Sequence, residues 1–472
     1  MSVTMTIESA AAVTGGELLR AGAAGGTRFS GVTIDSRHVD PGQAFVAIAG
    51  DRFDGHDFVA EAVNRGAVLV VVDRSSKKTL PPRAAVLRVD GTRAALGQLA
   101  RAWKIEVAPM SVAITGSVGK TTTKELTRAM LARLGPTHWN RGNLNNDIGL
   151  PLTLLAMPES TRFLVVEMGM NAPGEIAYLT GLAEPEIGVV TCVAPVHLEG
   201  LGSLEAVAEA KGELLRGLPG DGWAVVPGRE PLLASSLAAI PEARRVRFGE
   251  QAGDEVRILE VQGRGADGTR VALSLRGEEI AFDLPLVGAH NAKNAAAAAA
   301  VGMILGVEPA EIARTLASLP GEGLSHRSSV RRLGPWQVLD DCYNANPLAT
   351  RAALDTLVEL ASGVGAVAVL GDMLELGREA QRLHAEVGQH AAGLELDLLV
   401  TVGGLGGAIA KGALAAGMPP EKVHAAADAG EAAREVRRRA APGSWVLVKA
   451  SRGARLERVI DLLDEPATGG DS

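Results

Sequence analysis

The stretch Ser-Val-Ala-Ile-Thr-Gly-Ser-Val-Gly-Lys-Thr-Thr-Thr-Lys, residues 111–124, decides the fold prediction for this chain. It begins with an apolar, largely β-branched run at 112–115, passes through a glycine loop at 116–119, and leads into residues 124–134, whose composition favours a helix. In a strand–loop–helix unit of this kind, backbone N–H groups at the helix N-terminus surround phosphates, a lysine reaches the β- and γ-phosphates, and a hydroxyl binds Mg²⁺. The stretch therefore predicts a nucleotide-binding α/β domain.

The glycine loop is shorter than the general phosphate-binding motif, because Ile114 stands where that motif has its first glycine. An ordinary glycine turn is the alternative interpretation, but the preceding strand and the following helix favour nucleotide binding. The residues expected to bind the nucleotide here are Gly116, Ser117, Val118, Gly119, Lys120, Thr121 and Thr122.

The composition describes an ordinary globular protein with room for about three domains in 472 residues. A net charge of −8 argues against a nucleic-acid-binding protein, because phosphate contacts need a basic face. The two cysteines, Cys192 and Cys342, lie far apart and do not match any metal-binding spacing. This usage fits a reducing compartment without a disulfide framework.

Neither a signal peptide nor a membrane span is expected. The N-terminus lacks a basic segment followed by an apolar one. The most apolar tract, residues 295–307, is too short to cross a bilayer and is better interpreted as a buried helix. We expect a cytoplasmic protein.

The first block, residues 1–108, alternates short strands and turns. Strands are expected at 32–35, 44–49 and 67–73, helices at 58–65 and 91–103, and Pro109 marks a plausible boundary. Two polar clusters follow apolar runs, at 35–37 (Asp-Ser-Arg) and at 50–56. Spacing alone favours surface turns for both.

The middle block, residues 109–324, alternates strands and helices and predicts a mostly parallel sheet. A strand at 163–166 leads into Glu167, and one at 187–193 leads into the loop that contains His197. Ligands of open α/β sheets bind beyond the carboxyl ends of the strands. We therefore expect Lys120, Glu167 and His197 to lie together at one edge of the sheet.

A helix predicted at 203–218 carries Lys211 on its apolar stripe. Such a lysine can extend its ammonium outwards to solvent. Alternatively, it is a desolvated lysine with a functional charge or a covalent modification. The helix sequence leaves both interpretations open.

Strands at 255–261, 270–275 and 279–284 precede an alanine-rich helix. Asn291 is a candidate N-terminal cap for that helix. Asn294 is unusual so near the start of an apolar helix, and a ligand contact would explain it.

The last block, residues 325–472, alternates strands and helices and predicts a parallel, dinucleotide-fold-like sheet. Its strands are expected at 337–339, 366–370, 398–402, 423–425 and 445–449. The glycine-rich run at 403–407 lacks the spacing of a dinucleotide motif, so we interpret it as a turn.

Several stretches together resemble a known family. They are Thr-Gly-Ser-Val-Gly-Lys-Thr-Thr-Thr-Lys (115–124), Gly-Asn-Leu-Asn-Asn-Asp-Ile-Gly (142–149), Glu-Met-Gly-Met-Asn (167–171), His-Leu-Glu-Gly (197–200), Ala-Lys-Gly-Glu (210–213), His-Asn-Ala-Lys-Asn (290–294), Asp-Asp-Cys-Tyr-Asn-Ala-Asn-Pro (340–347), Gly-Asp-Met-Leu-Glu-Leu-Gly (371–377) and Val-Lys-Ala-Ser-Arg (448–452). Over nearly the whole chain, in register, the sequence resembles the Mur ligases, the ATP-dependent amino-acid ligases of peptidoglycan assembly. The asparagine-rich run (142–149), the Asp-Asp run (340–347) and the Gly-Asp-Met run (371–377) resemble the corresponding runs of those members that add D-alanyl-D-alanine.

The resemblance implies an α/β protein of three domains. These are a small uridine-nucleotide-binding domain (1–108), a central P-loop-type ATPase sheet domain (109–324) and a C-terminal Rossmann-like ligase domain (325–472). The implied reaction joins D-alanyl-D-alanine to UDP-N-acetylmuramoyl-tripeptide through an acyl phosphate, with ATP and Mg²⁺, in a cytoplasmic monomer. A folylpolyglutamate synthase shares the short phosphate loop and is one alternative. A nucleotide-driven switch or transport ATPase is the other, although the Asn-Lys-x-Asp guanine signature is absent from the sequence.

The resemblance also implies roles for individual residues. Lys120 and Thr121 would bind the ATP phosphates and Mg²⁺, Glu167 and His197 would be further metal ligands, and Lys211 would be carbamylated and hold metal. The remaining implied contacts are with adenine, ribose and phosphate at Asn294, Arg327 and Asp341, and with the peptide-nucleotide substrate at Asp35, Ser36, Arg37, Asn145 and Asn146. The sequence departs from the family pattern at Cys342, where serine is more usual, and at Ser325-His326.

Overall fold

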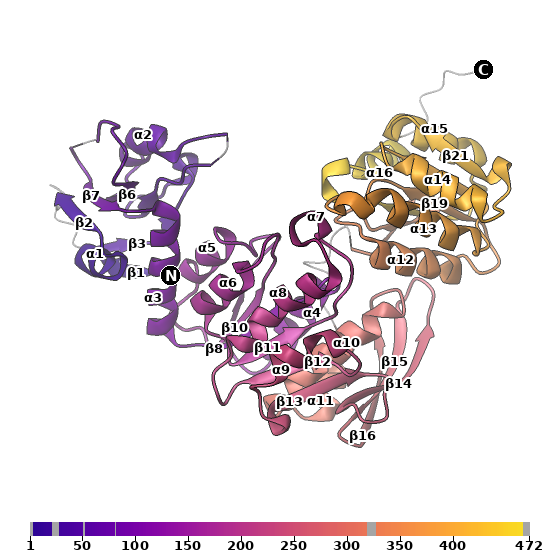
Figure 1. Ribbon diagram of the computed structural model, residues 1–472, viewed down its shortest axis with the longest axis horizontal. Helices are drawn as coiled ribbons and strands as arrows, with labels where there is room; N and C mark the ends of the chain where they lie inside the picture. Colours follow the sequence, from indigo (N-terminus) through magenta and orange to yellow (C-terminus); the bar gives the residue numbers. More distant parts are fainter. Residues whose placement is uncertain (1–2, 21–27, 51, 81, 319–326, 466–472) are drawn as a thin grey trace.

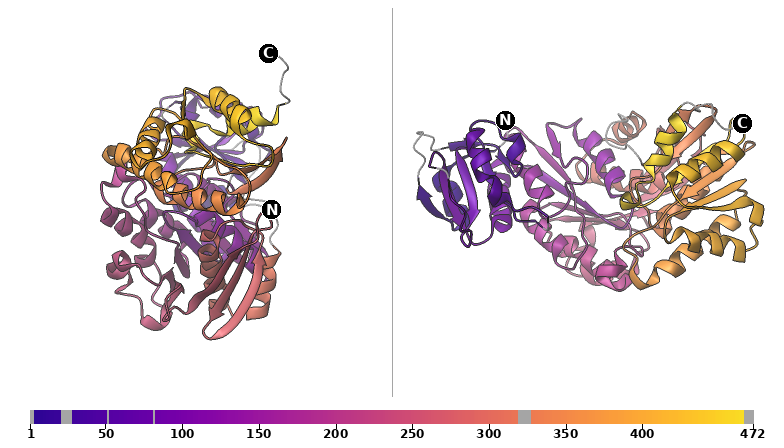
Figure 2. Two further views of the ribbon diagram at one scale, coloured as in Figure 1. Left: turned by 90° about the vertical axis from the view of Figure 1, so that its right-hand side faces the viewer. Right: turned by 90° about the horizontal axis from the view of Figure 1, so that it is seen from above.

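The computed structural model describes residues 3–20, 28–50, 52–80, 82–318 and 327–465. Figure 1 shows three lobes that follow one another along the long axis of the molecule, in chain order. The view from above in Figure 2 shows the same row, with the central lobe between the other two. The departure from the family pattern at Ser325-His326 lies outside the described residues.

The N-terminal lobe contains a five-stranded sheet among the described residues, in which β2 is antiparallel to β7 and the other neighbours are parallel. Its spatial order is β2 (Glu17–Arg20), β7 (Ala85–Val89), β6 (Leu69–Asp73), β5 (Ala44–Val46) and β4 (Val32–Thr33). The other elements of this lobe are β1 (Thr4–Thr6), β3 (Arg28–Ser30), α1 (Ile7–Thr14), α2 (Val59–Asn64) and α3 (Thr92–Val107). The expected strands and helices are present, with ends that differ by a few residues.

The central lobe contains a nine-stranded sheet within the described part of the chain. Its order is β16 (Glu278–Leu284), β15 (Thr269–Leu275), β14 (Val256–Gly263), β13 (Arg245–Gly249), β12 (Trp223–Pro227), β11 (Ile187–Val190), β8 (Met110–Thr115), β10 (Phe163–Glu167) and β9 (Thr137–Trp139). Every pairing from β9 to β14 is parallel, and β14 to β16 form an antiparallel meander. The predicted mostly parallel sheet is confirmed.

Helices cover both faces of the central sheet, so its strands are buried on both sides. Alternate residues of β8 show this: Val112 and Ile114 belong to one hydrophobic core, and Ala113 belongs to another. The helices on the first face are α4 (Lys120–Leu131), α10 (His290–Ile304) and α11 (Pro309–Ala317). Those of the second face are α5 (Gly149–Leu155), α6 (Glu175–Ala183) and α8 (Leu204–Arg216); the short helices are α7 (Leu198–Leu201) and α9 (Ala234–Leu237).

Two helix starts differ from expectation. The helix after the phosphate loop begins at Lys120 rather than at 124, because the left-handed Gly119 (φ 86°) ends the loop directly before it. The alanine-rich helix begins at His290, so Asn291 is not its N-cap. The amide of Asn291 instead donates to the Val287 carbonyl at 2.8 Å.

The apolar tract at 295–307 lies mostly in α10, where residues 295–302 are buried, as expected, and residues 303–306 are partly exposed. In the described part of the chain, no helix combines the length and the apolar character needed to cross a bilayer.

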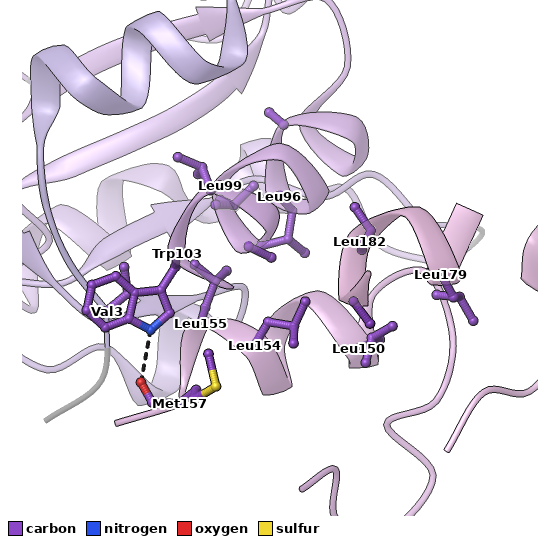
Figure 3. Packing of buried hydrophobic residues seen from close by; sticks show 14 of the residues in the cluster. Val3, Leu96, Leu99, Trp103, Leu150, Leu154, Leu155, Met157, Leu179 and Leu182 are labelled. Atoms are coloured by element: carbon purple, nitrogen blue, oxygen red, sulfur yellow. Dashed lines mark hydrogen bonds between the residues drawn. The ribbon is translucent and has the colours of Figure 1, made fainter. Parts of the chain in front are cut away.

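Helix α3 joins the N-terminal lobe to the central one. Its buried leucines and Trp103 pack against α5 and α6 of the central lobe, as Figure 3 shows. The Trp103 indole N–H donates to the Met157 carbonyl at 2.9 Å. The two lobes therefore share one continuous hydrophobic core. We propose the division at 108 and 324 because each of the four sheets in the described residues, including the two-stranded β1–β3 pair, falls within one block, although α3 packs across the first boundary.

We expect Trp103→Ala to lower the free energy of unfolding by about 3–5 kcal/mol, because it removes a large buried ring and leaves the Met157 carbonyl without its donor. Urea unfolding followed by circular dichroism measures this. Ile105→Ala on the same helix is the control, since Ile105 is 50% exposed and should change little. Equal stability of the two variants would contradict the shared core.

The C-terminal lobe contains a six-stranded sheet in the described residues. Its order is β17 (Ser329–Leu333), β18 (Trp336–Asp340), β22 (Trp445–Lys449), β19 (Ala366–Leu370), β20 (Leu398–Val402) and β21 (Val423–Ala426). Its helices are α12 (Pro347–Leu360), α13 (Ala380–Ala392), α14 (Gly406–Ala415), α15 (Ala429–Arg439) and α16 (Glu457–Asp464).

The five predicted strands of this lobe are parallel, as expected. Strand β17 was not predicted; it is an antiparallel edge strand with two exposed arginines and little apolar alternation. The glycine run at 403–407 is a turn: the Asp372 carboxylate accepts hydrogen bonds from the N–H groups of Gly404, Leu405 and Gly406. An internal carboxylate thus takes the amides that a phosphate would need.

Candidate active site

Two glycines shape the phosphate loop. Gly116 (φ 147°) and Gly119 (φ 86°) both have backbone conformations that favour glycine. A Cβ at Gly116 would lie 1.9 Å from Thr191 Oγ1, and one at Gly119 would lie 2.2 Å from Asn294 Oδ1. A larger residue at either position would therefore have a strained backbone and would displace the side chain of Thr191 or Asn294.

Hydrogen bonds fix this loop to the segment that follows β11. The Ser117 N–H donates to the Cys192 carbonyl (2.9 Å), and Ser117 Oγ donates to the Ala194 carbonyl (3.0 Å). Thr191 Oγ1 donates to the Val118 carbonyl at 2.5 Å. The carboxyl ends of β8 and β11 are thus held together, in front of the N-terminus of α4.

Lys120 and Glu167 face each other at this edge of the sheet. Lys120 Nζ donates to the Gly116 carbonyl at 2.8 Å. Burial lowers the pKa of Lys120, and Glu167 opposes that shift. Burial alone would raise the pKa of Glu167, but the positive charges of Lys120 and Arg327 hold it below its ordinary value. Glu167 is therefore a buried carboxylate in its charged form.

Both oxygens of Glu167 already accept hydrogen bonds. Thr121 Oγ1 donates to one (2.6 Å), and Asn145 Nδ2 donates to the other (2.9 Å). Asn140 holds the backbone of Glu167, because its side chain accepts from the Glu167 N–H and donates to the Glu167 carbonyl, each at 2.9 Å. Lys124 in turn donates to the Asn140 carbonyl at 2.7 Å. This network fixes the carboxylate before any ligand binds.

Asn145 and Asn146 were predicted to bind substrate. In the structure, Asn145 positions Glu167, and Asn146 Oδ1 accepts from the Gly149 N–H at 2.8 Å, where α5 begins. Both asparagines also line the cleft described below, so their assignment to substrate stays a proposal.

Lys211 lies on the buried face of α8 and is only 1% exposed. Its side chain therefore does not extend to the surface, and the first of the two interpretations is wrong. Among the described residues, no hydrogen bond or ion pair holds its ammonium group. Burial first, and then the charge of Lys120, lower the pKa of Lys211 well below its ordinary value.

The C-terminal lobe supplies the opposite wall. The Arg327 guanidinium lies 3.8 Å from the centroid of the Tyr343 ring. Asp341 accepts from the buried Lys449 ammonium at 2.5 Å and from the Ser328 N–H at 3.1 Å. These contacts fix the Arg327 cation, the Tyr343 ring and the Asp341 carboxylate in the same cleft as the phosphate loop.

Asn294 bridges α10 and α4. Its Oδ1 accepts from Thr123 Oγ1 at 3.4 Å, and its Nδ2 donates to Asn291 Oδ1 at 2.9 Å. The predicted ligand contact is compatible with this, since Asn294 also lines the cleft.

A cleft of about 1140 Å³ lies between the central and C-terminal lobes. It brings together most of the predicted residues: Ser117, Val118, Gly119, Lys120, Thr121, Thr122, Asn145, Asn146, Glu167, His197, Asn294, Arg327 and Asp341. Gly116 and Lys211 lie behind its surface and are not among the residues that line it. The predicted convergence of Lys120, Glu167 and His197 at one sheet edge agrees with this lining.

The cluster Asp35, Ser36 and Arg37 does not reach this cleft. It forms a short turn in the N-terminal lobe, where Ser36 Oγ donates to Glu61 at 2.7 Å. The exposed Arg37 pairs with Asp35 at 2.7 Å. His56 of the second polar cluster is buried, paired with Asp54, and accepts from the Asp73 N–H, so it supports the sheet.

The residues fit Mg²⁺, although no group of three or more His, Cys, Asp or Glu side chains suited to a metal occurs in the described part of the chain. Mg²⁺ usually binds one or two carboxylates and completes its shell with phosphate oxygens and waters. Thr121 and Glu167, with oxygens 2.6 Å apart beside the phosphate loop, are such a partial set.

Several site residues were missed from the sequence. Asn140 and Lys124 hold the backbone next to Glu167 through hydrogen bonds. Tyr343 and Lys449 belong to the C-terminal lobe and contact Arg327 and Asp341. Glu375 contacts His197. Tyr343, Lys449 and Glu375 fall inside motifs that carry the family resemblance, which was the available signal.

The three lobes match three family models in chain order. These are Mur ligase family, catalytic domain, at residues 28–104; Mur ligase middle domain, at 114–302; and Mur ligase, glutamate ligase domain, at 326–452. The chain belongs to the Mur ligase family.

Several relatives that match most of this chain share one name. UDP-N-acetylmuramoyl-tripeptide–D-alanyl-D-alanine ligase of Bacillus subtilis is 38% identical over 93% of this chain and 94% of its own length. A crystal structure of MurF from Acinetobacter baumannii matches 98% of this chain and 100% of its own, at 31% identity and a TM-score of 0.89. MurF ligase from Thermotoga maritima, solved with ADP, covers 92% and 97%, at 28% identity and a TM-score of 0.81.

Folylpolyglutamate synthase of Mycobacterium tuberculosis also matches, at 18% identity and a TM-score of 0.62 over 79% of this chain and 95% of its own. This likeness shows a shared fold alone.

Proposed function

We propose that this chain is an ATP-dependent, ADP-forming ligase that joins D-alanyl-D-alanine to UDP-N-acetylmuramoyl-tripeptide in peptidoglycan precursor synthesis. The observation that carries the proposal is the single cleft in which Lys120, Thr121 and Glu167 face Arg327 and Asp341. The named relatives, which match 93% and 98% of this chain, supply the choice of substrates.

The reaction needs a peptide carboxylate to attack the γ-phosphate of ATP, which gives an acyl phosphate and ADP. The amine of D-alanyl-D-alanine then attacks the acyl carbon, and phosphate leaves. Negative charge develops on phosphoryl oxygens, so the chain's task is positioning and electrostatic stabilisation. Lys120 and the amides of the 116–119 loop are the groups placed to do this.

Mg²⁺, when bound, would neutralise phosphate charge, and Thr121 and Glu167 are the residues that would hold it. Arg327 and Asp341 would bind the nucleotide from the C-terminal lobe. Because the cleft is built from two lobes, their approach would exclude water from the acyl phosphate.

We assign the uridine-nucleotide part of the substrate to the N-terminal lobe, at Asp35, Ser36 and Arg37. We expect Arg37→Ala to weaken binding of UDP-N-acetylmuramoyl-tripeptide by roughly 10- to 100-fold, because the loss of one charge-assisted hydrogen bond has an effect of about this size. ATP binding should not change, since Arg37 lies outside the cleft. Calorimetric titration of both ligands measures this, with Arg74→Ala in the same lobe as the control. Equal loss for both ligands would contradict the assignment.

One chain contains every element of the proposed site, so we propose a monomer, which sedimentation velocity would check.

The nucleotide-linked substrate and ATP indicate the cytoplasm, and both cysteines are free, which fits a reducing compartment.

Phosphate release from ATP tests the function against its alternatives. With UDP-N-acetylmuramoyl-tripeptide present, we expect release to require D-alanyl-D-alanine for sustained turnover. Turnover with a folate and glutamate instead would favour the folylpolyglutamate synthase alternative. Release that needs no amine and no carboxylate substrate would favour a switch ATPase.

A further inference from the structure

A contact between two lobes joins His197 to Glu375. His197 belongs to the loop that precedes α7, and Glu375 to the loop between β19 and a short 3₁₀ turn (Gly377–Glu379). The Nδ1 atom of His197 lies 2.5 Å from Glu375 Oε2. The His197 side chain is 21% exposed and that of Glu375 is 54% exposed, so the contact lies at the edge of the cleft.

The backbones of the two loops also dock. The Glu199 N–H donates to the Glu375 carbonyl at 3.2 Å. Gly377 has a positive φ of 55°, and a Cβ there would make a tight contact of 3.0 Å with Glu199 Cα, so glycine favours this close approach of the loops. Leu198 packs against the hydrophobic cores of both lobes. Figure 1 shows α7 beside the C-terminal lobe.

Both residues of the pair adopt left-handed backbone conformations, with φ 54° at His197 and φ 65° at Glu375. Neither is glycine, so each conformation is unfavourable by itself and persists only because its surroundings impose it. Strain of this kind at both members of one contact indicates that the side-chain geometry matters.

Each loop is held from behind. The loop of Glu375 is fixed by the buried His384, whose Nε2 accepts from the Met373 N–H at 2.9 Å, and by Ser451, whose Oγ accepts from the Leu374 N–H at 2.9 Å. The loop of His197 is tied to the phosphate loop, because the Ala194 N–H donates to Ser117 Oγ at 2.8 Å. The pair is thus braced on both sides.

The contact selects one form of the imidazole. An ionised carboxylate can only accept, so Nδ1 must carry the proton that it donates to Glu375. In the neutral ring, Nε2 then keeps a free lone pair. Among the described residues, none makes a hydrogen bond or ion pair with Nε2. His197 lines the cleft together with Lys120 and Thr121. Its Nε2 atom, with a free lone pair, is therefore the atom that can accept a hydrogen bond or bind a metal there.

We propose that Glu375 is a positioning residue: from the C-terminal lobe it holds His197 of the central lobe in the Nδ1–H form, with Nε2 free for the site. Docking of the C-terminal lobe then completes the site chemically as well as sterically. A carboxylate that orients a histidine in this way typically changes metal affinity or activity 10- to 100-fold when removed. The inference rests on the proposed function only in that His197 serves the ligase site.

The first readout needs no activity. Nitrogen NMR of histidine-labelled, metal-free protein at mildly alkaline pH reports which ring nitrogen carries the proton. The His197 signal is assigned by its loss in His197→Gln. We expect Nδ1–H in the wild type and a shift towards Nε2–H in Glu375→Ala. An Nε2–H ring in the wild type, or no change in the variant, would overturn the proposal.

The second readout is kinetic. We expect Glu375→Ala to lower kcat, or to raise the Mg²⁺ concentration for half-maximal rate, by about 10- to 100-fold with little change in the KM for ATP. Glu375→Gln should recover part of the loss, because its amide oxygen can still accept from Nδ1–H. Glu379→Ala is the matched control, since this exposed neighbour pairs with Arg382 and not with His197.

The outcomes separate the two claims. Wild-type kcat and Mg²⁺ dependence in Glu375→Ala would overturn the positioning role even if the ligase is active. A wild-type protein without ligase activity would remove the proposed function, while the NMR readout would still decide how Glu375 holds His197. Thermal unfolding of each variant checks that the fold is intact.

Discussion

Lys120→Ala should reduce ligase turnover by roughly 10³-fold or more while leaving the fold intact. Lys120 is the cation directly at the glycine loop, and removing a group that stabilises developing phosphoryl charge costs on this scale. Within the described residues, its side chain makes one hydrogen bond, to the Gly116 carbonyl, so the loop and α4 should survive without it. Coupled phosphate release measures the turnover, and circular dichroism checks the fold.

Lys411→Ala is the control for this experiment, because Lys411 is an exposed lysine of α14 in the C-terminal lobe. Turnover of Lys120→Ala equal to that of the control would show that Lys120 is not the phosphate lysine. The assignment of the whole loop would then fail with it.

Lys211→Ala should be nearly inactive, with a loss of about 10²-fold or more, because we propose that Lys211 is carbamylated and helps to hold Mg²⁺. Burial and Lys120 lower the pKa of Lys211, which exposes the neutral amine that carbon dioxide needs. Carbamylation turns this amine into an anion with carboxylate-like oxygens, which suits a magnesium site. Intact-protein and peptide mass spectrometry under bicarbonate would detect the added group.

Two variants sharpen this test. A small carboxylic acid added to Lys211→Ala should restore part of the activity by standing in for the carbamate. Lys211→Arg should stay inactive, since a guanidinium remains protonated and does not form this carbamate. Full activity in Lys211→Arg would sink the carbamate proposal, and the buried lysine would then have a packing role.

Much of the fold was predictable because its signals are local. The parallel strands of the central and C-terminal sheets are short apolar runs bounded by turns. The phosphate-loop motif predicts the strand before it and the helix after it. The edge strand β17 was missed because an exposed edge has no apolar alternation to detect. The shared core around α3 was missed because an amphipathic helix does not tell which lobe its apolar face will cover.

The site divides in the same way. The cleft gathers Lys120, Glu167 and His197 because their strands end at one edge, which follows from the parallel order. Asn140, which holds the Glu167 backbone, and Glu375, which contacts His197, act across long sequence separations that spacing does not reveal. The interpretation of Asn291 as a cap was wrong because its side chain bonds to Val287 instead.

The central claim is the identity of the bond that this chain makes, and mass spectrometry of the product tests it most directly. Purified protein is incubated with ATP, Mg²⁺, UDP-N-acetylmuramoyl-tripeptide and D-alanyl-D-alanine. Our account predicts a nucleotide product heavier than the tripeptide substrate by one D-alanyl-D-alanine less one water, with one ADP for each bond formed and no product without ATP. ATP hydrolysis without that product, or addition of another amino acid in place of the dipeptide, would contradict it.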